Sequence, residues 1–129
     1  MRHLHVDPKD ATPMWRQIEE GLRRLVASGS LKAGAPVPSV RELAAELSIN
    51  PATVVKAYQR LCDIGVLAVK RGEGTFVAEA PPSLPRGERN KTLTDGALRY
   101  ASLALTLGAT SEDAAAELDT AFRKLRRKP

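Results

Sequence analysis

Two short stretches of this chain combine side chains that can bind DNA with residues that turn the backbone. The first begins at Asn50 and Pro51 and continues with Ala52, Thr53 and Lys56, at spacings that suit one side of a helix. Amide and hydroxyl groups can hydrogen-bond to base edges in the major groove, and methyl groups can contact the methyl of thymine. Lys56, one turn further on, suits a phosphate or a guanine. The spacing therefore predicts a helix whose first turn contacts the bases of a duplex.

The second stretch is a basic, glycine-rich pentapeptide at residues 70–74. Lys70 and Arg71 supply the cations, and Gly72 and Gly74 allow the backbone to turn sharply. A guanidinium on such a tip can enter the minor groove of a duplex. We therefore predict a second DNA contact from the tip of a hairpin.

A third candidate contact lies at the start of the preceding helix. Ser39 and Glu42 have the spacing of a capping box, in which each side chain satisfies a free backbone N–H group. Arg41 lies beside the remaining free N–H groups, and together they form an anion-binding corner that suits a DNA phosphate. The alternative is that Arg41 is a solvated partner of Glu42 or of Glu46.

The elements that must position these residues follow from apolar spacing, caps and turn residues. Pro13 fits the first turn of a helix, Gly29 is a good residue to end that helix, and Gly65 can end the helix that begins at Pro51. The elements predicted for this region are helices over residues 14–29, 39–47 and 51–63 and strands over residues 66–69 and 75–78.

Two further amphipathic helices are predicted after a proline-rich boundary at residues 79–85. The first begins between Pro85 and Leu93 and ends at Gly108, and the second begins near Ser111. Two helices of this length bury little surface by themselves, so we expect them to pair with a second copy of the chain. The residues predicted for this dimerisation surface are Leu93, Ala97, Tyr100, Ala104, Leu107, Leu118, Phe122 and Leu125.

Composition limits the classes of protein to which the chain can belong. The 129 residues carry a formal net charge of +5, which permits nucleic-acid binding without establishing it. Cys62 is the single cysteine, which excludes an internal disulfide, and we interpret it as a buried, inert thiol. No apolar run is long enough to cross a bilayer, and the first ten residues lack the apolar stretch of a signal peptide. We therefore expect a cytoplasmic protein.

The motifs occur in an order that characterises one family of bacterial regulators. The segments PSVRELA, SINPATVVKAYQRL and KRGEGTFV resemble the winged helix-turn-helix of the GntR family. The upstream segments PMWRQI and GSLKAGAPVPS match the first helix and loop of that family, so the resemblance runs from about residue 4 to residue 79. The helical residues that follow are similar to the YtrA subfamily, whose short C-terminal helical pair serves dimerisation.

The resemblance implies a homodimer that binds a palindromic operator, usually as a repressor. Two positions depart from the family pattern. Val55 replaces a residue that is polar in many members, and Glu73 replaces a wing residue that is frequently basic or neutral. The resemblance implies DNA contacts at Arg41, at residues 50–53, at Lys56 and at residues 71–74.

These observations predict a mainly α fold with a small β-hairpin. An N-terminal winged helix-turn-helix over residues 1–80 precedes a short C-terminal helical pair for dimerisation over residues 81–129. The predicted function is that of a sequence-specific, dimeric transcriptional repressor whose partner is double-stranded operator DNA. The full set of predicted DNA contacts is Ser39, Arg41, Asn50, Pro51, Ala52, Thr53, Lys56, Lys70, Arg71, Gly72 and Gly74.

The alternative function is that of a winged helix that binds another protein and no specific DNA. An enzyme is not expected, because the sequence contains no paired carboxylates in a plausible pocket, no nucleophile with a base and no phosphate-binding glycine loop. No cofactor is predicted. His3 and His5 lack a third ligand, so no metal site is predicted, and no motif indicates a small-molecule effector.

Overall fold

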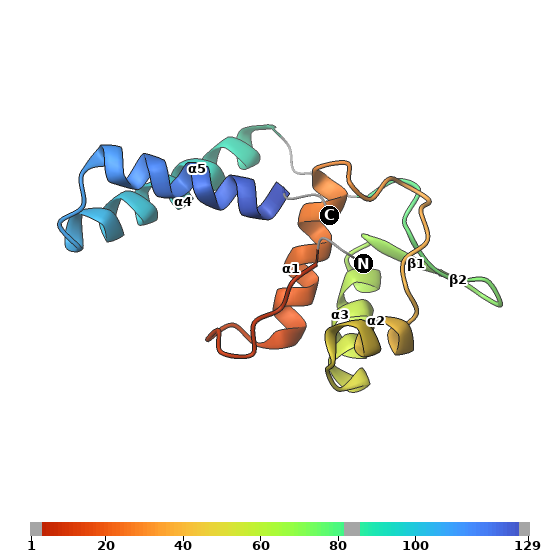
Figure 1. Ribbon diagram of the computed structural model, residues 1–129. Coiled ribbons are helices and arrows are strands. Elements are labelled where there is room, and N and C mark those ends of the chain that lie inside the picture. The colour runs from red at the N-terminus through yellow and green to blue at the C-terminus, as the bar shows by residue number, and fades with distance from the viewer. Residues whose placement is uncertain (1–3, 82–85, 127–129) are drawn as a thin grey trace. The chain divides into compact units, whose positions relative to one another are not determined.

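The computed structural model describes residues 4–81 and 86–126, and the chain divides into two compact units, residues 1–83 and residues 84–129 (Figure 1). The C-terminal unit contains α4 (Arg86–Thr106) and α5 (Ser111–Arg126). The predicted fold class, mainly helical with a small hairpin, is confirmed. The elements of the N-terminal unit are α1 (Met14–Ala27), α2 (Val40–Leu47), α3 (Pro51–Asp63), β1 (Leu67–Lys70) and β2 (Gly74–Val77).

Side-chain caps explain where α2 and α3 begin. The Ser39 hydroxyl accepts a hydrogen bond from the N–H of Glu42 at 3.1 Å, and the Glu42 carboxylate accepts one from the N–H of Ser39 at 3.0 Å. The capping box is therefore present as predicted. The side-chain oxygen of Asn50 accepts from the N–H of Ala52 at 2.9 Å, which caps α3, and Pro51 occupies the first position of that helix.

The hairpin differs from the prediction by one residue at each strand. Leu67 pairs with Val77 and Lys70 pairs with Gly74, which leaves residues 71–73 as the tip. The predicted strands, residues 66–69 and 75–78, each share three residues with the observed ones and are displaced by one residue, because Lys70 and Gly74, which were assigned to the turn, pair with each other. The turn is tighter, and it is closed by a hydrogen bond from the N–H of Glu73 to the carbonyl of Lys70 at 2.9 Å.

The segment before α2, predicted as a simple connecting loop, adds a further extended stretch beside β2. The N–H of Gly34 donates to the carbonyl of Val77 at 2.9 Å, and the N–H of Val77 donates to the carbonyl of Ala35 at 2.8 Å. The N–H of Val37 donates to the carbonyl of Thr75 at 3.0 Å. These bonds attach the hairpin to the chain that enters α2, so the hairpin and the helices share one framework.

Apolar residues from all the elements of the N-terminal unit form one core. Its largest fully buried side chains include Ile18 and Leu22 of α1, Leu43 of α2 and Leu61 of α3. Burial of a large aliphatic side chain contributes about 1.5–3 kcal/mol. The core therefore fixes the position of α3 relative to the rest of the unit.

The C-terminal unit is an antiparallel helical pair without a core of its own (Figure 1). The hydroxyl of Tyr100 on α4 donates to the carbonyl of Ala114 on α5 at 2.7 Å, and Thr110 and Asp113 cap α5 reciprocally. No described residue of this unit is buried. Its large apolar side chains that the structure reports as exposed are Leu93, Leu98, Leu103, Leu105, Leu107, Leu118, Phe122 and Leu125.

Candidate nucleic-acid interface

The first two turns of α3 present mainly small and polar side chains to solvent, with Val55 exposed among them. Val54 fills the core and is 0% exposed, so α3 is anchored by one side and leaves the other free. Such a helix can enter a major groove, where small residues allow a close approach to the base edges. The residues of this surface are Asn50, Pro51, Ala52 and Lys56, which are exposed, and Thr53, which is half-buried.

Arg41 lies exposed in the first turn of α2, beside the capping box. The pKa of Glu42 is held below its usual value because the backbone N–H of Ser39 donates to the carboxylate, and the Ser39 side chain adds to this effect. Glu42 is therefore ionised at neutral pH and is held by the cap. Arg41 is the single basic residue of α2, and it supplies the positive charge of the predicted phosphate-binding corner.

An aromatic ring on α1 holds several of the cations beside α3. The Lys56 ammonium lies 4.5 Å from the centroid of the Trp15 ring, the Arg60 guanidinium carbon lies 4.7 Å from it, and that of Arg16 lies 5.4 Å from it. Arg60 also donates from Nε to the buried carboxylate of Glu19 at 3.2 Å. Contacts of this kind contribute about 0.5–1 kcal/mol each at exposed sites.

This cluster was not predicted from the sequence. Lys56 was predicted as a DNA contact, but no contact of Lys56 or Arg60 with Trp15 was predicted. Trp15 and Arg60 are far apart in the sequence, so helical spacing within either segment gives no signal for the contact. The cluster orients Lys56 and Arg60 along the edge of α3 instead of leaving them free in solvent.

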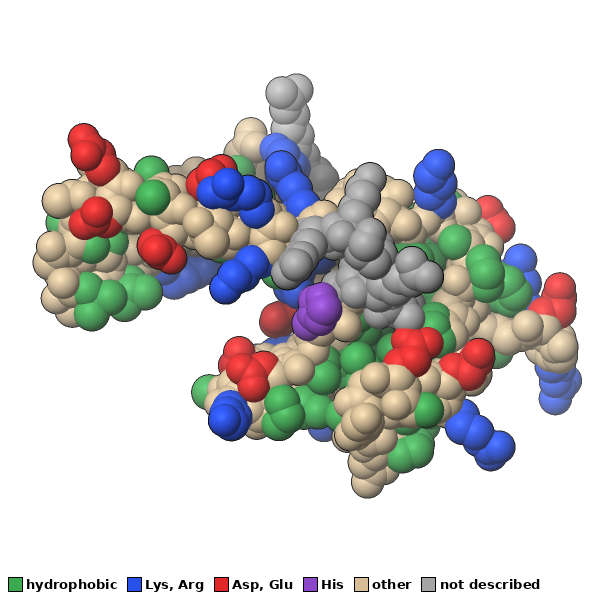
Figure 2. Space-filling view, viewed as in Figure 1, with side chains coloured by type: hydrophobic (Ala, Val, Ile, Leu, Met, Phe, Trp, Pro, Cys, Tyr) green, Lys and Arg blue, Asp and Glu red, His purple; other side chains and the backbone are tan. Residues whose placement is uncertain are grey.

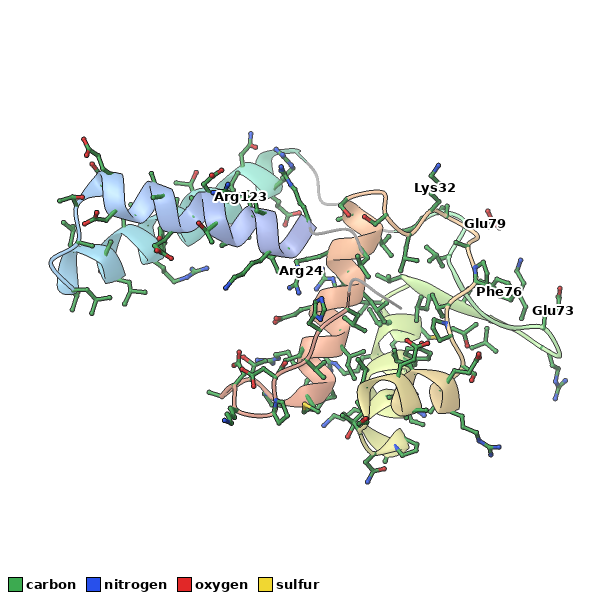
Figure 3. All side chains as sticks on the ribbon, viewed as in Figure 1. Arg24, Lys32, Glu73, Phe76, Glu79 and Arg123 are labelled. Atoms are coloured by element: carbon green, nitrogen blue, oxygen red, sulfur yellow. The ribbon has the colours of Figure 1, made fainter. Side chains whose placement is uncertain are left out.

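The tip of the hairpin carries an exposed basic residue, Arg71, and an exposed acidic residue, Glu73. Figure 2 shows basic and acidic side chains together at this tip. The Lys70 ammonium instead lies 4.7 Å from the centroid of the Phe76 ring, which draws it back along the strand. Gly72 has φ 79° and Gly74 has φ 124°, so both adopt backbone conformations that favour glycine. Figure 3 shows Glu73 at the end of the hairpin.

A buried tyrosine joins α3 to the segment that carries the capping box. The Tyr58 hydroxyl donates to the carbonyl of Pro38 at 2.7 Å, and the side chain is 5% exposed. Burial raises the pKa of Tyr58 well above its ordinary value, and the nearby carboxylates of Glu46 and Glu42 raise it further. The phenol therefore remains neutral, and it fixes the start of α2 against α3.

The structure places the predicted dimerisation residues in two groups. Tyr100 and Ala104 are half-buried, together with Gly96 four residues earlier, along the side of α4 that meets α5. Leu98 and Leu105, which were not predicted for this surface, are seven residues apart and are 65% and 77% exposed. The remaining predicted residues, all exposed, are Leu93, Ala97, Leu107, Leu118, Phe122 and Leu125.

The described residues give no support for a reactive cysteine, a metal site or a membrane-spanning helix. Cys62 is a free, half-buried thiol, and burial raises its pKa, with a further contribution from Asp63. Residues 4–81 and 86–126 contain no group of three potential metal ligands, and His3 lies outside them. Over the same ranges, no helix has the length and apolar character that crossing a bilayer requires.

Comparison with known sequences matches the N-terminal unit to one family. The family described as bacterial regulatory proteins, gntR family, matches residues 15–77. The repressor YtrA of Bacillus subtilis is 41% identical over 76 residues, which cover 59% of this chain and 58% of YtrA. The chain thus spans less than two thirds of the length of this relative, and 16% and 22% of two other curated relatives that it matches.

Solved structures extend the similarity beyond this segment. YtrA from Sulfolobus acidocaldarius, a GntR-family transcription factor, superposes with a TM-score of 0.58 at 33% identity and covers 74% of this chain and 97% of its own. The DNA-binding domain of AraR, solved in complex with operator ORX1, superposes with a TM-score of 0.52 at 27% identity and covers 58% of this chain and 93% of its own. From its sequence and its fold, this chain belongs to the GntR family of bacterial regulatory proteins.

Proposed function

We propose that this protein is a dimeric transcriptional repressor that binds an inverted-repeat operator in double-stranded DNA. The observation that carries the proposal is the exposed first turn of α3, where Asn50, Ala52 and Thr53 stand on a helix that is anchored by its buried side. The similar AraR domain was solved with operator DNA, which supports the same use of this surface here. Repression is steric in this proposal, because an occupied operator blocks the polymerase.

Three groups of residues have separate roles in the proposed complex. Thr53 and its neighbours at the start of α3 read base edges in the major groove. Arg41 and Lys56 bind phosphates and set the register of the protein on the duplex. Arg71 enters the minor groove from the hairpin, while Glu73 beside it repels phosphates and limits how closely the tip approaches.

The proposed dimer forms through the C-terminal unit, which begins at residue 84. None of the described residues of this unit is buried, and such a helical pair gains stability when a second copy covers its apolar side chains. A two-fold dimer requires an inverted repeat, with half-sites about one helical turn, or about 10 bp, apart. The proposed location is the cytoplasm, and the proposal assigns the protein no catalytic activity.

The test begins with selection of bound sequences from a random pool of duplex DNA. An inverted repeat with a spacing of about 10 bp supports the proposal. Recovery of no enriched sequence, with no salt-dependent binding, would overturn it and favour a winged helix that binds another protein. Binding of the selected operator is then measured by fluorescence anisotropy at several salt concentrations.

Two variants separate base reading from phosphate binding. Thr53→Ala should weaken operator binding by about 1–3 kcal/mol and relax the preference at one base pair. Arg41→Ala should weaken binding to all sequences alike and lower the magnitude of the salt slope by about 0.9. Lys9→Ala is the matched control, because Lys9 is an exposed cation of the N-terminal loop outside the proposed interface.

A further inference from the structure

The second helix of the C-terminal unit carries an exposed apolar stripe. Leu118, Ala121 and Leu125 recur at intervals of three and four residues, so they lie along one side of α5. Leu118 is 45% exposed and Leu125 is 54% exposed, and Ala121 between them is exposed as well. The stripe is therefore only partly covered by α4, and the small residue at its centre permits close approach of another helix.

Two opposite charges flank this stripe on the same side. Glu117 and Lys124 are seven residues apart, so they lie on one face of α5, near the two ends of the stripe. Both side chains are exposed. Asp119 and Arg123 instead pair with each other within the helix at 2.9 Å, so they neutralise one another.

We propose that a second copy of the chain packs on this stripe in the antiparallel direction, with the two-fold axis near Ala121. The inference rests on the proposed dimer and specifies its geometry. In this arrangement, Glu117 of each copy faces Lys124 of the partner subunit, and two attractive pairs form. In a parallel arrangement, the same positions bring two glutamates together and two lysines together.

The test is the dimer dissociation constant of the full chain, measured by sedimentation equilibrium at low ionic strength. Glu117→Lys and Lys124→Glu each replace two attractive pairs by two repulsive ones, so each should weaken the dimer about 5- to 30-fold. The double variant Glu117→Lys/Lys124→Glu restores two attractive pairs and should return the dissociation constant to within about threefold of the wild type. Asp95→Lys, on α4, changes the charge equally and should have little effect.

Each outcome decides one question. Single variants that dimerise as well as the wild type, or a double variant that is no better than the single ones, would overturn the antiparallel arrangement while leaving the proposed dimer intact. A wild-type chain that remains monomeric at high concentration would instead contradict the proposed function. A single variant could also dimerise weakly because its helix content falls. The double variant distinguishes this case, because the second substitution restores the charge pairs but not the helix propensity.

Discussion

The N-terminal and C-terminal units both carry apolar residues at helical spacing, but these side chains are mainly buried in the first unit and mainly exposed in the second. In the N-terminal unit, fourteen apolar residues from three helices, a hairpin and the segments beside them are buried in one cluster. In the C-terminal unit, no described residue is buried, although both helices carry leucines at helical spacing. The comparison shows that amphipathic spacing predicts a helix and an apolar face, but it does not tell whether that face is covered within the chain or by a partner.

The largest expected effect comes from separating the two units. A fragment of residues 1–83 keeps the whole core cluster and should unfold cooperatively as a monomer. Its operator affinity should fall by about 10²–10⁴-fold, because the second recognition helix is no longer held nearby. Circular dichroism, sedimentation and anisotropy measure the three properties. A fragment that still dimerises would place the dimer interface in the N-terminal unit. It would contradict the view that a partner covers the apolar face of the C-terminal unit.

The same substitution in the two units gives the next largest contrast. Leu61 on α3 is 0% exposed and Leu105 on α4 is 77% exposed. Leu61→Ala leaves a cavity in the core and should lower the free energy of unfolding by about 2–5 kcal/mol. Leu105→Ala should change it by less than about 0.5 kcal/mol. Urea unfolding measures both, and a large effect at Leu105 would show that α4 is covered on that side.

Removal of one hydroxyl tests how firmly the N-terminal unit holds the start of α2. Tyr58→Phe leaves the carbonyl of Pro38 without its donor and should lower the free energy of unfolding by about 1 kcal/mol. Because the fold raises the pKa of Tyr58, the neutral phenol is favoured in the folded state. The contribution is therefore complete below the ordinary tyrosine pKa and is lost as the pH rises beyond it. Denaturation at neutral and alkaline pH should show that loss in the wild type and not in Tyr58→Phe.

The smallest expected effect is on the stability of the N-terminal unit at acidic pH. The fold lowers the pKa of Glu42, so its ionised carboxylate stabilises the folded state above the ordinary carboxyl pKa and ceases to do so as the pH falls through the lowered value. Glu42→Gln should therefore be less stable than the wild type at neutral pH, and the difference should shrink in acid. Thermal unfolding across this range measures it, and a constant difference would argue against a role for the charge.

Local chemistry made the caps and the helix boundaries of this chain predictable. Ser39 and Glu42 form the reciprocal cap that their spacing indicates, and Asn50 with Pro51 begins α3 at the expected residue. Each of these features depends on residues within four positions of one another. The hairpin after α3 was predicted in the same way, from two short segments that flank a glycine-rich turn.

Contacts between segments that are far apart in the sequence could not be predicted from such local patterns. The stacking of Lys56 and Arg60 on Trp15 requires α1 and α3 to be side by side, and no local pattern records that neighbourhood. The bonds between the segment at residues 34–37 and β2 have the same origin. For the candidate interface, the residues of α3 and of the hairpin were predicted from the sequence, while the contacts of Lys56 and Lys70 with aromatic rings were found only in the structure.

The bonds that attach residues 34–37 to β2 also bear on how proteins of this kind can diversify. They secure the base of the hairpin to the entrance of α2, but they stop short of residues 71–73 at its tip. Mutations at the tip can therefore accumulate without disturbing α3, because the base of the hairpin is bonded to the chain independently of the tip. Relatives that share this arrangement can change the contacts that the tip makes in the proposed complex while α3 keeps its proposed position in the major groove.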